Sequence, residues 1–169
     1  MLLRSLASLI PENPRTSIPI AMTAPKDHLR LYGPIQLATA ETDCWKCHKS
    51  TPSQSLMAED IESFSSYAEV QPRRNNRRTF FYGVAADSMP PELTKSLEER
   101  APHYKPTFSR TVQETSWASQ CVHCGALLGA FFEHSEPDGP FFARPSEFLG
   151  SLEILSESGF DIDSASYSI

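Results

Sequence analysis

All four cysteines of the chain lie in two short pairs, and they are the side chains best suited to chemistry. Cys44 and Cys47 form one pair, and Cys121 and Cys124 form the other. Two intervening residues let both sulfur atoms of a pair face the same point, so each pair can supply half of a tetrahedral Cys₄ shell. Gly125 follows the second pair and suits the tight turn that such a site makes. We expect one structural zinc ion, and we call the turns at residues 44–47 and 121–124 the first and second knuckle.

The distance in sequence between the knuckles is unusual. Between Cys47 and Cys121 lie 73 residues, whereas a compact zinc ribbon has roughly 15–20. A metal ion would therefore clamp two distant parts of the chain. Two alternatives stay open, namely a disulfide or thiol pair and a covalently attached haem.

The haem alternative rests on the first knuckle, because Cys44, Cys47 and His48 form the C-x-x-C-H attachment pattern. Against it, Gly125 stands where a second histidine would be, and haem attachment would leave the second pair unexplained. We expect His48 to be exposed or to lie just outside the ligands, and Trp45 to pack over the metal as a lid. His123 lies inside the second knuckle, but the cysteines are the expected ligands.

Enzymatic motifs are absent from the sequence. Four thiolates close the shell of a zinc ion and leave no position for an activated water. His134 and Glu136 form the H-x-E of the zinc nucleobase deaminases, but here both cysteine pairs precede it and Gln120 replaces the expected proline. There is no nucleophile elbow, phosphate-binding loop, dinucleotide fingerprint or H-E-x-x-H. We expect a non-enzymatic protein. The histidines, which are His28, His48, His103, His123 and His134, share no motif.

Length and composition indicate one ordinary domain. The 169 residues are 40% hydrophobic and 21% charged, and no apolar run approaches the roughly 20 residues of a membrane helix. Net charge is −6, and the acidity is concentrated after residue 132, where eight acidic residues face one arginine, Arg144. Nothing global attracts nucleic acid or an anionic membrane.

The first residues carry four prolines among polar residues, and Arg4 and Pro11 leave too short an apolar core for a secretory signal. We expect residues 1–28 to form a flexible arm, with Met22 as a possible alternative start. A cytoplasmic, reducing location follows as an expectation, and it favours metal over disulfide.

Apolar and polar residues alternate over residues 29–40 around a Gly-Pro break, which predicts a strand that leads into the first knuckle. A similar strand is predicted at residues 108–117, before the second knuckle. The other predicted strands cover residues 51–57, 79–84 and 151–155, and residues 59–64 are expected to be an acidic connector. Residues 88–100 predict a helix capped by Ser88, with Leu93 and Leu97 on one face.

Residues 127–132 fit a strand or a helix equally well. Two Phe-Phe pairs flank a Pro-Asp-Gly turn, so we expect a hairpin or sharp reversal whose rings form much of the core. The expected fold is α+β, mostly β, with a zinc-ribbon-like core. A single zinc-clamped domain would span residues 29–155, with residues 48–120 as an insertion carrying one short helix. Residues 156–169 would form an acidic tail whose last ten residues fray.

A basic cluster lies directly before three aromatic residues. Its arginines could hold phosphates while the rings stack on bases, which makes a nucleic-acid-binding zinc ribbon the alternative function. A solvated loop followed by a strand is favoured, because the chain is acidic overall. The residues concerned are Arg73, Arg74, Arg77, Arg78, Phe80, Phe81 and Tyr82.

The acidic C-terminal third favours a basic protein partner, because negative charge speeds and selects such association. The most concrete version is a toxin nuclease held by its immunity protein. The residues expected to contact the partner are Glu136, Asp138, Glu147, Glu153 and Glu157.

Both knuckles resemble a known sequence pattern. Residues 44–52, CWKCHKSTP, and residues 121–126, CVHCGA, are similar to a group of uncharacterised bacterial proteins that pair a CWxC knuckle with a CxxCGA knuckle. The resemblance covers about a third of the chain. It implies zinc and a bacterial cytoplasmic setting, and no established activity.

Overall fold

The computed structural model describes residues 28–64, 73–74, 76–142, 146–163 and 165–168. Its framework is one long, bent antiparallel hairpin. The first arm contains β1 (His28–Tyr32) and β2 (Ile35–Asp43), and the second contains β3 (Ser50–Ala58) and β4 (Asp60–Phe64). β2 pairs with β3, and β1 pairs with β4. The first arm bends at Gly33-Pro34, and the single strand predicted at residues 29–40 is divided there into β1 and β2.

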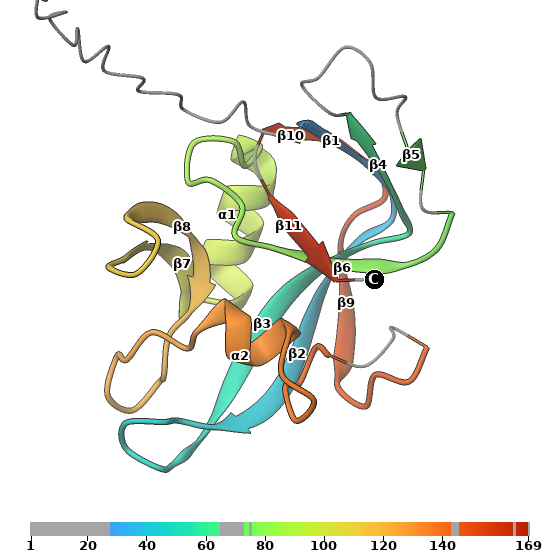
Figure 1. The fold of residues 1–169 in the computed structure, drawn as a ribbon. Coiled ribbons are helices and arrows are strands. Elements are labelled where there is room, and N and C mark those ends of the chain that lie inside the picture. Colours follow the sequence, from blue (N-terminus) through green and yellow to red (C-terminus); the bar gives the residue numbers. More distant parts are fainter. Residues whose placement is uncertain (1–27, 65–72, 75, 143–145, 164, 169) are drawn as a thin grey trace, which may run out of the picture.

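Both arms bend, so the hairpin contributes to two sheets that curl around a common interior (Figure 1). One sheet has the strand order β11-β6-β3-β2-β9 and the other β10-β1-β4-β5. The added strands are β5 (Arg73–Arg74), β6 (Thr79–Tyr82), β9 (Ser151–Ser156), β10 (Asp161–Asp163) and β11 (Ser166–Ser168). The fold is therefore mostly β. No helix among the described residues is long and apolar enough to cross a membrane.

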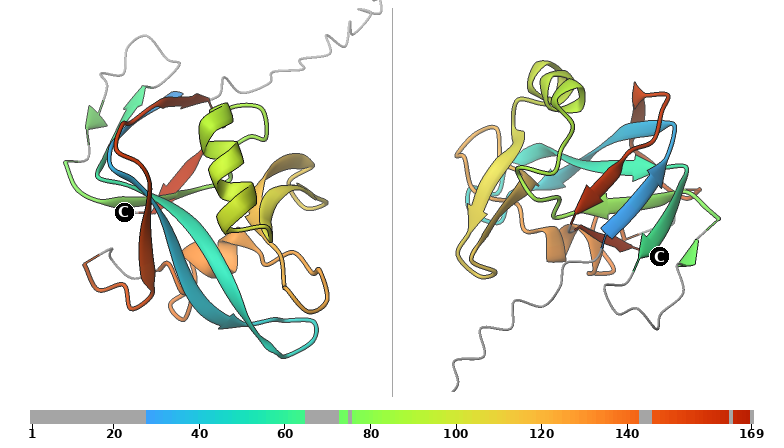
Figure 2. Two further views of the ribbon diagram at one scale, coloured as in Figure 1. Left: turned by 180° about the vertical axis from the view of Figure 1, so that it is seen from behind. Right: turned by 90° about the horizontal axis from the view of Figure 1, so that it is seen from above.

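The main core fills the interior of the curled sheets. Leu29 and Leu31 of β1 point inward because side chains alternate along a strand, as their burial pattern shows. Helix α1 (Pro91–Arg100) adds Leu93 and Leu97, as predicted from their spacing. The hairpin of β7 (Tyr104–Ser109) and β8 (Glu114–Ser119) packs beside α1 (Figure 2). It contributes the rings of Tyr104 and Trp117.

Three local predictions need correction. The acidic connector at residues 59–64 is largely β4, in which Ile61 is buried. The single strand predicted at residues 108–117 is instead the β7–β8 hairpin, because the chain reverses near Gln113, which has a positive φ. Ser88 does not cap α1, since its hydroxyl donates to the carbonyl of Ala85 and the helix begins at Pro91.

The predicted boundary after residue 155 is also wrong. β10 pairs with β1, and β11 pairs with β6. Both partners have edges whose backbone groups need hydrogen bonds, and the end of the chain supplies them. Ile162 is buried in the main core, and Asp161 forms an ion pair with Arg30 of β1. The predicted arm at residues 1–28 lies outside the described residues except for His28.

Residues 48–120 do not form a separate insertion. They supply β3, which is the central strand of the larger sheet, together with β4 to β8 and α1. The Phe-Phe prediction is mostly wrong. Phe141 is fully buried, but Phe131, Phe132 and Phe142 are 61%, 67% and 49% exposed. Residues 127–132, which fitted a strand or a helix equally well, lead into a short helix, α2 (Ala130–His134). The buried side chains of this helix are Glu133 and His134, and not the two phenylalanines before them.

Candidate metal centre

The fold brings the two knuckles together at one end of the larger sheet. The first knuckle is the turn between β2 and β3, and the second follows β8 directly. Ser119, the last residue of β8, accepts a hydrogen bond from the backbone N–H of Gln54 and donates to its carbonyl. These contacts hold the end of β8 against β3. Contact of β8 with β3 therefore brings together the cysteine pairs, which are 73 residues apart in sequence.

The sulfur atoms of Cys44, Cys47, Cys121 and Cys124 all lie within 4.8 Å of one another. Cys44 Sγ is 3.7 Å from Cys124 Sγ, and Cys47 Sγ is 3.6 Å from Cys121 Sγ. A tetrahedral zinc site with zinc–sulfur bonds of about 2.3 Å has sulfur–sulfur edges of about 3.8 Å. The four side chains could therefore hold one metal ion. All four are free thiols, and their separations are well beyond the roughly 2.05 Å of a disulfide.

The two knuckles share one backbone conformation. Cys44 N–H donates to Lys49 C=O at 3.0 Å, and Cys121 N–H donates to Ala126 C=O at 2.8 Å. The residue after the second cysteine returns its N–H to the carbonyl of the first cysteine in both turns, at 2.8 and 2.9 Å. That residue is His48 in one knuckle and Gly125 in the other, with φ of 54° and 67°. The predicted repeat of strand and knuckle is confirmed.

A side chain from each knuckle also forms a hydrogen bond with the backbone that follows the other knuckle. Trp45 Nε1 donates to the carbonyl of Leu127 at 2.9 Å, and His123 Nε2 lies 2.9 Å from the carbonyl of Ser50. Because a carbonyl only accepts, the His123 ring is the donor. Trp45 is 66% exposed, so it is not the buried lid that we expected. It acts as a brace between the knuckles.

The sulfur atoms differ in exposure. Cys44 and Cys121 are buried, whereas Cys47 and Cys124 are half-buried. Burial would raise the pKa of Cys121, but hydrogen bonds from the N–H groups of His123 and Cys124, together with those to the side chains of Cys44 and Cys47, lower the pKa to about 6. A thiolate forms most easily at this position, and thiolates are the form that binds metal.

The proposed nucleic-acid surface does not form as predicted. Phe80 and Phe81 are completely buried, so their rings are not accessible to bases. Tyr82 is half-buried and stacks on His134, with ring centres 4.0 Å apart. Arg78 forms an ion pair with Glu59 at 2.8 Å, and Arg77 is exposed. The backbones of Arg73 and Arg74 form β5, and their side chains lie outside the described part.

The acidic residues expected at a partner surface do not form one cluster. Glu136, Asp138 and Glu147 belong to the segment after α2 that leads to β9. Glu153 lies on β9 and pairs with Arg100 of α1 at 2.9 Å. The backbone of Glu157 packs against Gly33, at the bend between β1 and β2. Only the first three share one segment of the chain.

Sequence analysis missed a pair of buried titratable residues in α2. Glu133 accepts a hydrogen bond from Ser53, and burial raises its pKa to about 7. His134 stacks between Tyr82 and Phe141, and burial lowers its pKa to about 3. No local sequence pattern marks them, because their burial follows from how α2 packs on β3 and β6.

Comparison with known proteins adds no relative. No protein-family model, curated protein or solved structure matches the chain. The function must therefore be argued from the geometry of the chain itself.

Proposed function

We propose that Cys44, Cys47, Cys121 and Cys124 bind one structural zinc ion and that the protein is a non-enzymatic binding module for a basic protein. The sulfur separations suit a tetrahedral thiolate shell, which has no open position for a substrate or water. The braces made by Trp45 and His123 support a clamp that joins two chain segments. In this proposal the knuckles form a zinc-ribbon-like centre inside a larger β fold.

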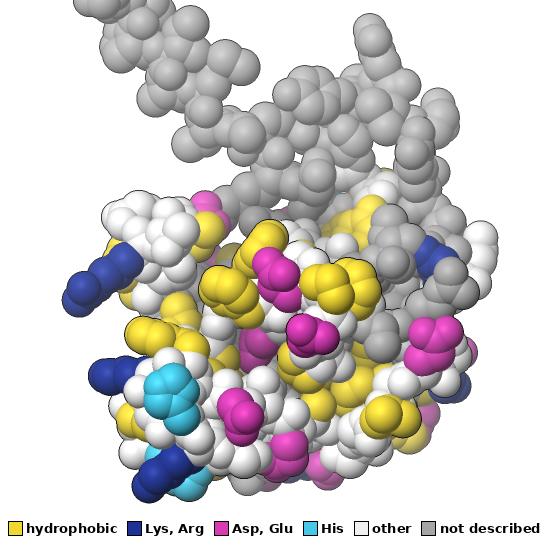
Figure 3. Space-filling view, turned by 60° about the horizontal axis from the view of Figure 1, so that its bottom comes forward, with side chains coloured by type: hydrophobic (Ala, Val, Ile, Leu, Met, Phe, Trp, Pro, Cys, Tyr) yellow, Lys and Arg dark blue, Asp and Glu magenta, His cyan; other side chains and the backbone are white. Residues whose placement is uncertain are grey.

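One observation carries the binding function. The segment from α2 to β9 exposes large apolar side chains beside acidic ones, and we call this set the acidic–apolar surface. Figure 3 shows hydrophobic and acidic side chains near one another on the face that lies at the bottom of Figure 1. Exposed apolar side chains of this size are typical of interaction sites, and aromatic residues often dominate their energy. The set comprises Phe131, Phe132, Phe142, Leu149, Glu136, Asp138 and Glu147.

The chemistry of this surface favours a basic partner with apolar contact residues. Its carboxylates would attract a cationic protein and repel nucleic acid. An immunity protein that inhibits a basic toxin, such as a nuclease, is the most concrete form of the proposal, in a bacterial cytoplasm. Burial of Phe131 and Phe132 in the complex would supply affinity, while the charges would supply association rate and specificity.

Metal content tests the first half of the proposal. Elemental mass spectrometry of the purified protein should give one zinc per chain, with no Soret band in the visible spectrum. Four thiols should become reactive after chelation and not before it. A protein that contains no metal, or that carries haem, would contradict the zinc centre.

Site-specific photo-crosslinking tests the second half. Benzoylphenylalanine placed at Phe131 in the full-length protein should crosslink, in cells of the native host, to a protein with an excess of Lys and Arg. The same group at Val112, which is 62% exposed in the distant β7–β8 turn, is the matched control. Reversing Asp138 to Lys should abolish the crosslink at Phe131. No crosslink, an acidic partner, or equal labelling from Val112 would contradict the function.

A further inference from the structure

A stretch of β2 has a free hydrogen-bonding edge. β3 pairs with β2 as far as Asp43, but β9 pairs with β2 only as far as Thr39, opposite Ser151. Residues 40–43 therefore have a partner strand on one side, and none of the described strands pairs on the other. Such an edge presents unpaired backbone N–H and C=O groups.

The direction of these groups follows from two observations. A Cβ atom on Gly150 would collide with the carbonyl oxygen of Thr39, so that carbonyl points away from β3. Glu41 lies opposite Pro52 in the register, and proline has no N–H to donate across the pair. Because backbone groups alternate in direction along a strand, the N–H and C=O of Glu41 and Asp43 also point to the free edge.

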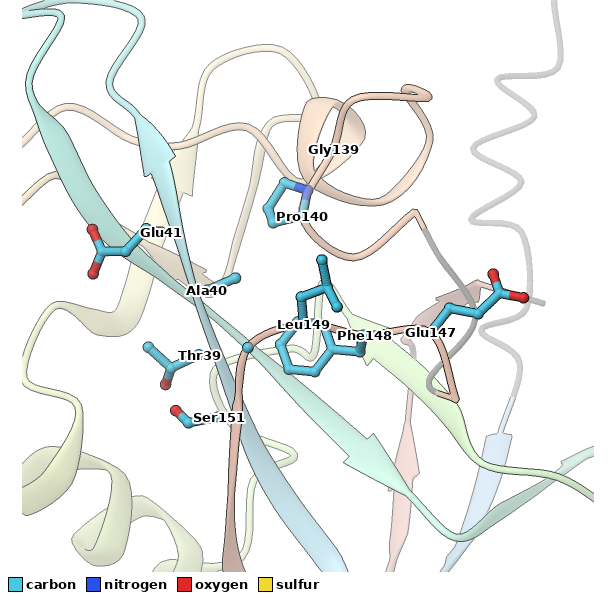
Figure 4. A pocket seen from close by; sticks show the side chains of 10 residues that line it. Thr39, Ala40, Glu41, Gly139, Pro140, Glu147, Phe148, Leu149 and Ser151 are labelled. Atoms are coloured by element: carbon cyan, nitrogen blue, oxygen red, sulfur yellow. The ribbon is translucent and has the colours of Figure 1, made fainter.

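The start of this edge, at Ala40 and Glu41, forms with Thr39 one wall of a groove with a volume of about 780 Å³. The opposite wall is the loop that leads into β9, and Figure 4 shows Pro140, Phe148 and Leu149 there, facing β2. Leu149 is 99% exposed, whereas Phe148 is half-buried against a cluster that contains Phe80 and Phe141. The groove thus combines a hydrogen-bonding edge with an apolar wall, which is the arrangement that binds an extended strand.

The charges along the groove are of one sign. Glu41 and Glu147 line it, and none of the described lining residues is a lysine or an arginine. Asp138 precedes Gly139, which lines the groove as well. A second copy of this chain would bring its own glutamates against these, so like charges oppose self-pairing here. An extended segment with basic residues and an apolar residue fits the groove best.

We propose that the groove binds an extended basic and apolar segment of the partner protein, which continues the larger sheet by pairing with β2 at Glu41 and Asp43. This inference rests on the proposed function and names how the partner is held. One face of the added strand would lie on Leu149 and Phe148, and its basic residues would lie near Glu41 and Glu147. Main-chain hydrogen bonds would provide affinity, and the charges would select the segment.

Photo-crosslinking from the groove tests this mode of binding. Benzoylphenylalanine at Leu149 should label the same basic partner as at Phe131, within a segment that contains Lys or Arg. Glu41→Pro removes the outward N–H and should lower the yield about tenfold, as expected for loss of strand pairing. Glu41→Gln keeps that N–H and should lower the yield only about twofold to threefold. Equal effects of the two substitutions would show attraction by charge alone and would overturn the proposal.

One further variant and one comparison of crosslinking positions make the result decisive. Leu149→Arg changes a fully exposed side chain, so it should fold normally while it reduces partner capture about tenfold, whether or not Glu41→Pro folds. Capture unchanged by Leu149→Arg would overturn the groove. Labelling from Phe131 without labelling from Leu149 would refute the groove and leave the proposed function standing. No labelling from either position would refute both, and labelling of a second copy of this chain would also overturn the groove proposal.

Discussion

The indole Nε1 of Trp45 donates a 2.9 Å hydrogen bond to the carbonyl of Leu127, a residue that lies three positions beyond Cys124. The reciprocal contact joins His123 to the carbonyl of Ser50, three positions beyond Cys47. The two knuckles thus make equivalent side-chain hydrogen bonds to each other's flanking chain, as well as equivalent backbone turns. These contacts join each knuckle to the chain beyond the other, so they help to hold the two cysteine pairs together.

Removal of the Trp45 brace should cost little stability. Trp45→Phe deletes the donor but keeps an aromatic ring, so the free energy of unfolding should fall by about 1 kcal/mol, the usual net value of one hydrogen bond. Thermal denaturation should show a midpoint lower by about 2–4 °C, with metal content unchanged. Val112→Ala, a change at another exposed apolar residue, should have almost no effect. A variant that loses its metal would show that Trp45 does more than brace.

Removal of the metal should be far more damaging. In the proposed site an ion would join residues 44–47 to residues 121–124, and binding of structural zinc contributes on the order of 10 kcal/mol in small zinc domains. A chelator such as TPEN, or Cys121→Ser, should lower the midpoint of unfolding by well over 10 °C in differential scanning calorimetry. His123→Ala removes only a brace and should retain one metal ion. An unfolding curve that does not respond to chelator would contradict the clamp.

The two residues that follow the second cysteines should respond oppositely to substitution. His48 has φ of 54°, a region that costs a residue with a Cβ about 1 kcal/mol. His48→Gly should therefore raise the free energy of unfolding by about 0.5–1 kcal/mol. Gly125 has φ of 67° with open space around its Cα, so Gly125→Ala should lower the free energy by about 1–2 kcal/mol through backbone strain alone.

Lys46→Gly is the matched control in the same turn. Lys46 does not have a positive φ, so glycine there should lower the free energy of unfolding by about 0.5–1 kcal/mol. Urea denaturation of the three variants at one pH measures all of these differences. If Lys46→Gly were stabilising, the effect of His48→Gly could not be assigned to relief of backbone strain at a positive φ.

Glu133 should make stability depend on pH. Its pKa rises from 4.5 in the unfolded chain to about 7 in the fold, chiefly through burial. The folded state therefore holds the proton over a range where the unfolded state releases it. The contribution of Glu133 to the free energy of unfolding should therefore fall, by on the order of 3 kcal/mol, as pH rises from about 4.5 to 7, with no further change above that range. Glu133→Gln should remove this contribution and become relatively more stable at pH 7.5.

Burial of His134 makes the free energy of unfolding depend on pH in the opposite direction, so its effect must be separated from that of Glu133. Its pKa is lowered to about 3 by burial, so its contribution to stability is complete above about pH 6.5 and is lost as pH falls. The informative quantity is therefore the difference between Glu133→Gln and the unsubstituted protein in urea denaturation at each pH. A difference that stays constant from pH 5 to 8 would contradict the assignment to Glu133.

Local patterns predicted several parts of the fold well. The alternation on both sides of Gly33 predicted extended chain there, and the spacing of Leu93 and Leu97 predicted the buried face of α1. The strand at residues 51–57 is β3 (Ser50–Ala58) with small shifts at both ends. Periodicity and turn residues act within a few positions of the chain, so one sequence is enough to detect them.

Other parts depended on partners that are distant in sequence. Phe131 and Phe132 are as apolar as Phe141, yet only Phe141 is buried, because Phe80 and Phe148 surround it. The tail became structured because β1 and β6 had free edges to pair with. Composition and periodicity do not encode which surface meets which, so these outcomes could not be predicted.

The sequence by itself determined the candidate ligand set, because the only four cysteines occur as two pairs whose spacing dictates the turn each one makes. Only the tertiary structure decided that the two pairs meet. That outcome requires β8 to lie against β3, where Ser119 contacts Gln54 across 65 positions of sequence. It also decided that Trp45 braces the centre, that Glu133 is buried, and that β2 keeps a free edge, because each depends on packing between segments that no local pattern relates.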